Sequence, residues 1–403
     1  MQAPEADNYS QELKAKLTNA MPGFSPDFPD DLDPYTMGVS APERSDFPVP
    51  ELLLLLLRNS MNWAWSGHEE KTRWTVYGSV DGAPICFQLR KFGLRILYSD
   101  ASKPNFKSLV GRLHAGLRIL ENDLSFYAIE QLNVGNLSIA NRHAQFENRY
   151  RFFRQKADKA FKKADPARTK KKAKKKSKRN IGEKAGESDG VTFSLAEGLN
   201  KMWRARSAGF YYSASMVDAY FSSLEHQAIL LRAFTGKPMH EGDVLTLIKD
   251  KWDSKLKGII DFDQNYEAGN CLGRMRQIKE RVRNPFAHGG MENDGASLMF
   301  HVPNLGALPA SLSAIKDSVQ FSFFPIEEDR HDEICATFDD LDTLLRSNDL
   351  DGPYRPMEAG IDPSFDADSL ARYASLHQAG TNELEQFIDD WMTEWERHAN
   401  MDY

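Results

Sequence analysis

The stretch Leu272–His288, LGRMRQIKERVRNPFAH, decides how this chain of 403 residues folds around its most distinctive residues. Apolar side chains recur in it at close to helical spacing: Leu272, Met275, Ile278 and Val282. This periodicity predicts a helix over 264–283. Pro285 disfavours helical geometry at Asn284, so we expect the helix to stop there and a short second helix to begin at 285. The sequence therefore predicts a helix, a break and an exit through Gly289-Gly290.

Two side chains at this break have complementary chemistry. Arg283 is a permanent cation that can hold a phosphate through two parallel hydrogen bonds. His288, five positions later, can take and give a proton near neutral pH. RNA carries its own nucleophile, the 2′-OH, so these two roles are enough to cleave a phosphodiester without a metal ion. The pair is thus a candidate phosphodiester-cleaving site.

Spacing alone is weak support for this interpretation. With 10 histidines among 403 residues, an arginine four to six positions before a histidine arises by chance, and Arg372–His377 also fits. That second match has no asparagine, helix breaker or glycine exit. A structural alternative also stands, in which Arg283 is an ion-pair partner and His288 caps a helix.

The motif Arg283-Asn284-x-x-Ala287-His288-Gly289 resembles the Arg-Asn-x-x-x-His signature of HEPN domains. These are all-helical modules of prokaryotic toxins, abortive-infection proteins and RNA-targeting CRISPR effectors. The stretch 207–226 is similar to the long helix that precedes the motif helix in that fold. The resemblance covers about residues 195–290 and extends to no other part of the chain.

The resemblance implies a role for each matching residue. Arg283 would hold the scissile phosphate, His288 would act as general base or acid, and Asn284 would orient the phosphate or the histidine. The implied activity is that of a metal-independent endoribonuclease, a toxin or anti-phage defence effector, with RNA as substrate and no cofactor. A homodimer with a composite active site is implied, with a possible neutralising or sensor partner. The alternative is a non-catalytic RNA- or nucleotide-binding or dimerisation module of a defence complex.

Further charged residues lie near the motif. Arg276, Lys279 and Arg281 are predicted to bind RNA, since Arg276, Lys279 and Arg283 form a basic stripe at i, i+3 and i+7. On the preceding helix, Asp218 and Glu225 belong to a polar stripe. They either orient Arg283 or His288, or belong to a solvated face that pairs with cations of the motif helix; the sequence leaves both readings open.

Composition excludes several classes. The net charge of −7 and a hydrophobic content of 41% are ordinary for a globular protein. Cys86, Cys271 and Cys335 are far apart and form no metal-ligand or disulfide pattern, so no metal site is predicted. The longest apolar run, Leu52–Leu57, is too short to span a membrane. The acidic start lacks the basic segment of a signal peptide, so the prediction is a cytoplasmic protein without membrane contact.

The predicted fold class is α+β and predominantly α-helical. Residues 1–165 are expected to form an N-terminal small-sheet-plus-helix domain of unknown role, 166–190 a basic disordered linker, and 191–403 a HEPN-like helical bundle with a C-terminal extension. The linker contains 166–179, with nine cations and no acid. It is either an arm that binds RNA electrostatically or a solvated spacer.

The coarse elements follow from periodicity and turn signals. A hairpin is predicted from 74 to 90 with its turn at Asp81-Gly82, and Leu94–Tyr98 supplies a third strand. Residues 105–163 are expected to be helical, and strands at 297–302 and 319–324 to form an appended hairpin. The tryptophans near the first sheet either pack inward or stack bases.

Overall fold

The computed structural model describes residues 3–164, 188–263, 266–284, 298–313, 318–321, 326–347 and 350–401. Its fold is α+β and predominantly helical, as predicted, and the chain divides into two compact units. Unit 1 comprises residues 1–132 and 385–403, and unit 2 comprises residues 133–384. The divisions fall inside helix α3 (Phe106–Val134) and helix α14 (Thr381–Asn400).

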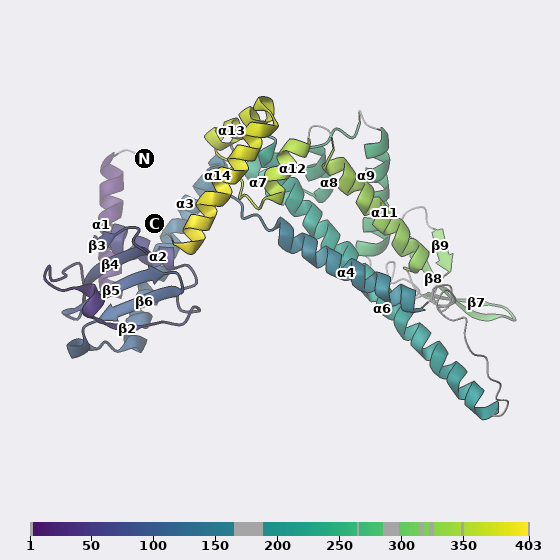
Figure 1. Ribbon diagram of the computed structural model, residues 1–403, viewed down its shortest axis with the longest axis horizontal. Coiled ribbons are helices and arrows are strands. Elements are labelled where there is room, and N and C mark those ends of the chain that lie inside the picture. The colour runs from purple at the N-terminus through teal and green to yellow at the C-terminus, as the bar shows by residue number, and fades with distance from the viewer. Residues whose placement is uncertain are drawn as a thin grey trace, which may run out of the picture. The chain divides into compact units, whose positions relative to one another are not determined.

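Unit 1 is built on a six-stranded antiparallel sheet, and three helical segments contribute to its core. The strand order is β1-β4-β5-β6-β2, and β3 also pairs with β4. The strands are β1 (Phe24–Ser25), β2 (Gly38–Ser40), β3 (Ala64–Ser66), β4 (Thr72–Val80), β5 (Ala83–Arg90) and β6 (Gly93–Tyr98). The helical segments are α1 (Ala3–Ala20), α2 (Pro50–Leu54), which continues as a π-helical turn (Leu55–Ser60), and α3. Figure 1 shows the strands side by side with these segments against them.

The central hairpin is confirmed. Strand β4 pairs with β5 across the turn at Asp81-Gly82, and β5 pairs with β6. Both turn residues have positive φ, 52° at Asp81 and 77° at Gly82, which matches the right-handed twist of the flanking strands. The turn chemistry therefore fixes the register of the sheet.

The core of unit 1 lies between one face of the sheet and the helices. Trp74, Phe87 and Ile96 from the strands pack with residues of α1, α2 and α3. Trp63 and Trp74 are buried, which confirms the inward packing predicted for aromatic residues. Trp65 differs, because it is 42% exposed and lies under the guanidinium of Arg58 at 3.7 Å.

Unit 2 is a helical array around one long helix. Its helices are α4 (His143–Ala164), α6 (Ser188–Phe234), α7 (Asp243–Lys249), α8 (Trp252–Lys257), α9 (Tyr266–Ile278), α11 (Glu328–Leu345), α12 (Asp351–Glu358) and α13 (Ala367–Ala379). Helices α4 and α6 run side by side, and α6 extends past the end of α4 (Figure 1). The helix predicted over 105–163 is thus two helices, α3 and α4, separated by residues 135–142.

The predicted domain boundary at 166–190 does not coincide with this division. Helix α4 packs along α6, so it belongs to the same unit as the helix that follows the basic segment. The boundary falls instead after Leu132, and residues from Glu385 onward join unit 1. The basic run 166–179 itself lies outside the described residues.

Aromatic rings fill the centre of unit 2. Tyr220 of α6 stacks on Phe338 of α11 with ring centroids 3.8 Å apart, and Tyr150 of α4 meets both rings edge-on. The hydroxyl of Tyr220 donates to the carboxylate of Asp342 at 2.8 Å. Burial raises the pKa of Asp342 to about 6, against the lowering effect of that hydrogen bond.

A second sheet in unit 2 has three strands: β7 (Leu298–Val302), β8 (Gly306–Ser313) and β9 (Ser318–Phe321). The two predicted strands are present, but each pairs with β8 and they do not pair with one another. Strand β8 was not predicted, because Pro309 in its middle is unusual inside a sheet.

All three cysteine thiols are free and buried. Burial raises the pKa of Cys86 and Cys335 to about 12 and that of Cys271 to about 11. They are therefore protonated at neutral pH. None of the described helices combines the length and apolar character needed to cross a lipid bilayer.

Candidate functional site

The α-helical geometry of α9 ends at Ile278, but the chain stays helical beyond it. It continues as a π-helical turn over Lys279–Arg283, and the amide of Asn284 donates to the carbonyl of Lys279. Asn284 itself keeps helical backbone angles, φ −61° and ψ −44°. The helix predicted over 264–283 is therefore present to Arg283, with Asn284 as its C-cap, where Nδ2 of Asn284 also donates to Glu280 at 3.1 Å. The short second helix expected from 285 lies outside the described residues. Single π turns inside helices are frequent at functional sites.

The π turn presents Arg283 to helix α6. Its Nε donates to Asp218 and its Nη1 to Glu225, both at 3.4 Å. These distances exceed the usual range for such bonds, so the contacts orient the guanidinium without binding it tightly. In the described part of the chain, Nη2 has no hydrogen-bond partner. Arg283 is therefore a positioned cation with donors to spare, and its side chain is 22% exposed.

Two aromatic rings lie beneath the cations of this site. Phe221 and Trp252 meet edge-to-face with ring centroids 5.1 Å apart. The guanidinium of Arg283 lies 5.3 Å from the centre of the Phe221 ring, and the ammonium of Lys279 lies 5.5 Å from that of Trp252. Cation–π attraction favours both placements.

These residues form a cleft, which we call the arginine cleft. Its volume is 640 Å³. It is lined by Asp218, Lys251, Trp252, Asp253, Arg276, Lys279, Glu280, Arg283 and Asn284. Four cations face three carboxylates there. Burial lowers the pKa of Lys279, and the neighbouring charge of Arg283 lowers it further, so an anion in the cleft would relieve repulsion between the two cations.

One of these carboxylates serves two arginines. Asp218 accepts from Arg283 through Oδ1 at 3.4 Å and from Arg149 of α4 through Oδ2 at 3.2 Å. On the opposite side of the cleft, Arg276 donates to Asp253 at 2.8 Å. Burial alone would raise the pKa of Asp253, but the hydrogen bond and charge of Arg276 outweigh it and lower the pKa. The acids thus hold the arginines in place.

The structure brings most of the predicted site together. Arg283, Asn284, Arg276 and Lys279 all line the arginine cleft. Arg281 does not line it; its Nε is buried and has no hydrogen-bond partner among the described residues. His288 lies outside the described residues.

The sequence missed the side of the cleft that α8 supplies. Lys251, Trp252 and Asp253 enter it from the start of that helix. They belong to no motif, and their only signal is an aromatic residue between opposite charges. Asp218 and Glu225 contact Arg283, as both the orienting interpretation and simple pairing with cations of the motif helix predict.

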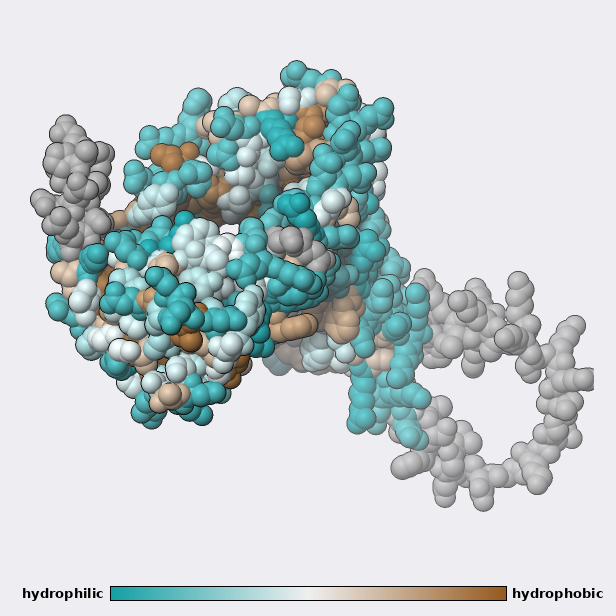
Figure 2. Space-filling view, turned by 60° about the vertical axis from the view of Figure 1, so that its left-hand side comes forward, coloured by the Kyte–Doolittle hydropathy of each residue, from teal (hydrophilic) through white to brown (hydrophobic). Residues whose placement is uncertain are grey.

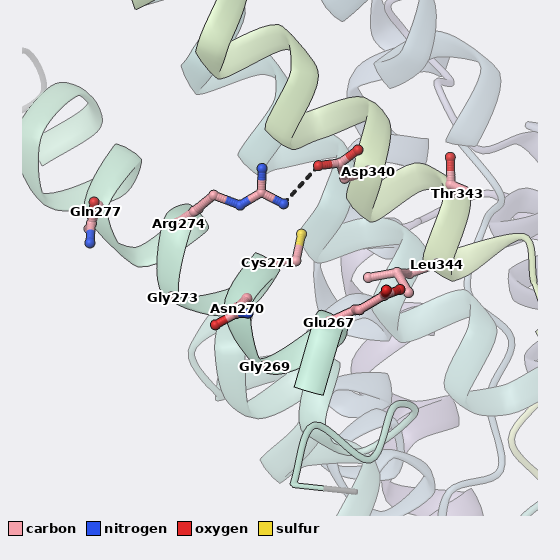
Figure 3. Close-up of a pocket in the computed structure, with 10 residues that line it drawn as sticks. All are labelled: Glu267, Gly269, Asn270, Cys271, Gly273, Arg274, Gln277, Asp340, Thr343 and Leu344. Carbon is pink, nitrogen blue, oxygen red and sulfur yellow. Dashed lines mark hydrogen bonds and ion pairs between the residues drawn. The ribbon is translucent and has the colours of Figure 1, made fainter. Parts of the chain in front are cut away.

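A second hollow, of 760 Å³, lies on another side of α9, against α11. Figure 3 shows Arg274 extended from α9 toward Asp340 of α11, where they form an ion pair at 2.7 Å. Cys271 lies beside them, and its raised pKa leaves it without nucleophilic thiolate at neutral pH. Because its one cation is already paired, this groove lacks the free positive charge of the arginine cleft.

Within the described residues, no three or more His, Cys, Asp or Glu side chains gather as a metal-binding group. Comparisons with protein-family models, with curated proteins and with solved structures found no match to this chain.

Proposed function

We propose that this protein is an endoribonuclease that cleaves RNA through attack of the 2′-OH, without a metal ion. The observation that carries the proposal is the position of Arg283, held over Phe221 at the edge of a cleft by Asp218 and Glu225. A guanidinium oriented in this way loses less conformational freedom when it binds a phosphate.

The reaction assigns each residue a task. Arg283 binds the non-bridging oxygens of the scissile phosphate, and Asn284 orients that phosphate or the histidine. His288, by resemblance to HEPN domains, takes the proton of the 2′-OH or protonates the leaving oxygen. The 2′-oxygen forms a bond to phosphorus, and the bond from phosphorus to the 5′-oxygen breaks. The products are a 2′,3′-cyclic phosphate and a 5′-hydroxyl.

The charge pattern supports an anionic substrate. Lys251, Arg276 and Lys279 line the same cleft as Arg283. Burial, and secondly the charge of Arg283, lower the pKa of Lys279, so a phosphate bound beside these two cations would gain from both charges. The contacts of Arg283 are long enough for a phosphate to compete with the two carboxylates.

The wider role follows from the resemblance to HEPN domains. We propose a cytoplasmic toxin or anti-phage defence effector that acts as a homodimer, so that two motifs share one active site. A neutralising or sensor partner would keep it inactive until it is needed.

The test is cleavage of total RNA in the presence of EDTA, with mapping of the new ends. The wild-type protein is expected to leave 5′-hydroxyl and cyclic or 3′-phosphate ends. Arg283→Ala and His288→Ala are each expected to lower the rate about 100-fold or more. The matched controls are Arg372→Ala and His377→Ala, which alter the chance copy of the motif and are expected to leave the rate unchanged.

The main alternative is a non-catalytic module that binds RNA or a nucleotide in the same cleft. The ion pairs of Arg283 are compatible with it, since a binding site also needs an oriented cation. In that case the wild-type protein would leave RNA intact, and Arg283→Ala would weaken binding. If neither cleavage nor binding depended on Arg283, both functions would be excluded.

A further inference from the structure

Helix α4 carries a row of exposed residues along one line of its surface. Arg149, Phe152, Lys156, Lys159 and Lys163 follow one another at intervals of three, four, three and four residues. This spacing places them on one face of a helix. All five are exposed, Phe152 to 52%. We call them the α4 stripe.

The lysines of the stripe are not neutralised by any described residue. In the described part of the chain, no carboxylate lies within ion-pair distance of Lys156, Lys159 or Lys163. Other cations of the same helix differ: Arg151 pairs with Glu147 at 2.6 Å, and Arg154 pairs with Asp339. Free positive charge therefore gathers on the stripe.

An aromatic ring interrupts the row of cations. The ammonium of Lys156 lies 5.3 Å from the centre of the Phe152 ring. The side chain of Phe152 is 52% exposed and lies between cations. A base of a single strand can stack on such a ring while the neighbouring phosphates contact the lysines. A duplex offers no free base to such a ring.

The stripe lies in the most basic part of the chain. Residues 156–206 hold 17 Lys and Arg against six Asp and Glu, although the whole chain has a net charge of −7. Figure 2 shows the far end of the α4–α6 pair, at the lower right, as a predominantly hydrophilic surface. Such charge asymmetry favours nucleic acid as a partner.

The stripe begins at the arginine cleft. Arg149, its first member, shares Asp218 with Arg283. From Arg149 to Lys163 the helix rises about 21 Å, which is enough to accompany several nucleotides. A strand that enters the cleft at Arg283 can therefore continue along α4, past Arg149 and the ring of Phe152, to the three lysines.

We propose that the α4 stripe is a binding track for single-stranded RNA that leads to the cleft at Arg283. Lys156, Lys159 and Lys163 contact successive phosphates, and Phe152 stacks on a base. The track rests on the proposed ribonuclease function for its substrate but performs no chemistry. It therefore sets affinity and not the rate of the bond-breaking step.

The experiment measures binding of a 2′-O-methylated single-stranded RNA, which cannot be cleaved, to the full-length protein over a range of salt concentrations. The triple variant Lys156→Glu, Lys159→Glu, Lys163→Glu is expected to bind about tenfold more weakly or worse. Its salt dependence should also be shallower by about two in the log–log slope, since three phosphate contacts are lost. The control is a second triple variant, Lys237→Glu, Lys249→Glu, Lys257→Glu, at three exposed positions of unit 2 outside the stripe. It changes the net charge by the same amount as the α4 triple variant and should bind RNA as the wild type does.

Phe152→Ala separates stacking from charge. It is expected to weaken binding about fivefold or more with the salt slope unchanged. Equal weakening of RNA binding in both triple variants would overturn the proposed track, because net charge alone would then explain binding. Wild-type affinity in the α4 triple variant would also overturn it. A preference for duplex RNA with no effect of Phe152→Ala would also overturn it.

A cleavage assay with unmodified RNA tests the ribonuclease function and the binding track separately. If the wild type binds through the stripe and does not cleave, the track stands and the ribonuclease function fails. If it cleaves and the α4 triple variant binds and cleaves equally well, the function stands and the track fails.

Discussion

Between pH 4 and 6 the stability of unit 2 depends on His226, whose pKa burial lowers to about 4, and, in the opposite direction, on the carboxyl group of Asp342. Burial raises its pKa from 3.8 to about 6. In this window the folded protein therefore keeps a proton on Asp342 that the unfolded chain has released, and the contribution of this group to stability falls as pH rises. Above pH 6 the cost is constant, at most about 3 kcal/mol.

Asp342→Asn should remove that cost and still accept the hydrogen bond from Tyr220. We expect the free energy of unfolding at pH 7.5 to exceed that of the wild type by about 1–3 kcal/mol, and this difference to shrink as the pH falls from 6 to 4. Urea unfolding at several pH values measures both. Asp340→Asn, at an exposed ion pair, is the control and should change stability by less than about 1 kcal/mol. An unchanged pH profile in Asp342→Asn would contradict the assignment.

At the same scale, the sequence located part of the site and could not locate the rest. Arg283 and Asn284 were found because a helix break and a motif coincide there. Arg281 is predicted to bind RNA because of its charge, but it does not line the cleft, and its Nε is buried. Lys251 and Trp252 were missed because only tertiary packing brings α8 to the cleft.

The end of helix α6 depends on a glycine that has no room for a side chain. Gly236 has φ of +63°, and a Cβ there would lie 2.2 Å from the backbone nitrogen of Ala374 in α13. Gly236→Ala would introduce both backbone strain and a collision with α13. We therefore expect the free energy of unfolding to fall by about 3 kcal/mol or more. The midpoint of urea unfolding followed by helical circular dichroism measures it.

Gly242, before α7, separates the two effects. It also has positive φ, +82°, but a Cβ there would meet nothing within 4 Å. Gly242→Ala should therefore cost only the conformational strain, about 1 kcal/mol. Equal losses in the two variants would show that the collision at Gly236 is relieved by movement of α13.

Elements whose signals are local were the ones that the sequence predicted. The β4–β5 hairpin depends on Asp81-Gly82, a turn signal that acts within a few residues. The break between α3 and α4 was missed, because residues 135–142 are held by contacts distant in sequence. Asn141, for example, donates to the carbonyls of Met357 and Ile361, both at 2.9 Å.

At the scale of the whole molecule, unit 1 is completed by the last described residues of the chain. The carbonyl of Met401 accepts from the amide of Lys71 at 3.1 Å, and Asn400 accepts from Lys91 at 3.1 Å. Met401 is also buried. The domain prediction placed these residues with the helical bundle, since no local pattern announces a return to the first unit.

Removal of residues 385–403 should therefore destabilise unit 1 by about 2–3 kcal/mol. Amide hydrogen exchange is expected to accelerate in β4 and β5 and to stay unchanged along α6. Wild-type protection throughout unit 1 would show that this C-terminal segment contributes nothing to its stability. Accelerated exchange confined to α6 would place the segment with unit 2.

The burial of all three native cysteines has a practical consequence for spectroscopy. Their thiols are protonated and shielded, so a maleimide dye should react slowly with the unaltered protein. A cysteine introduced at an exposed position, such as that of Gln155 beside the α4 stripe, would then carry the label alone. The protein can therefore be labelled at one chosen position for fluorescence measurements without replacing any native cysteine.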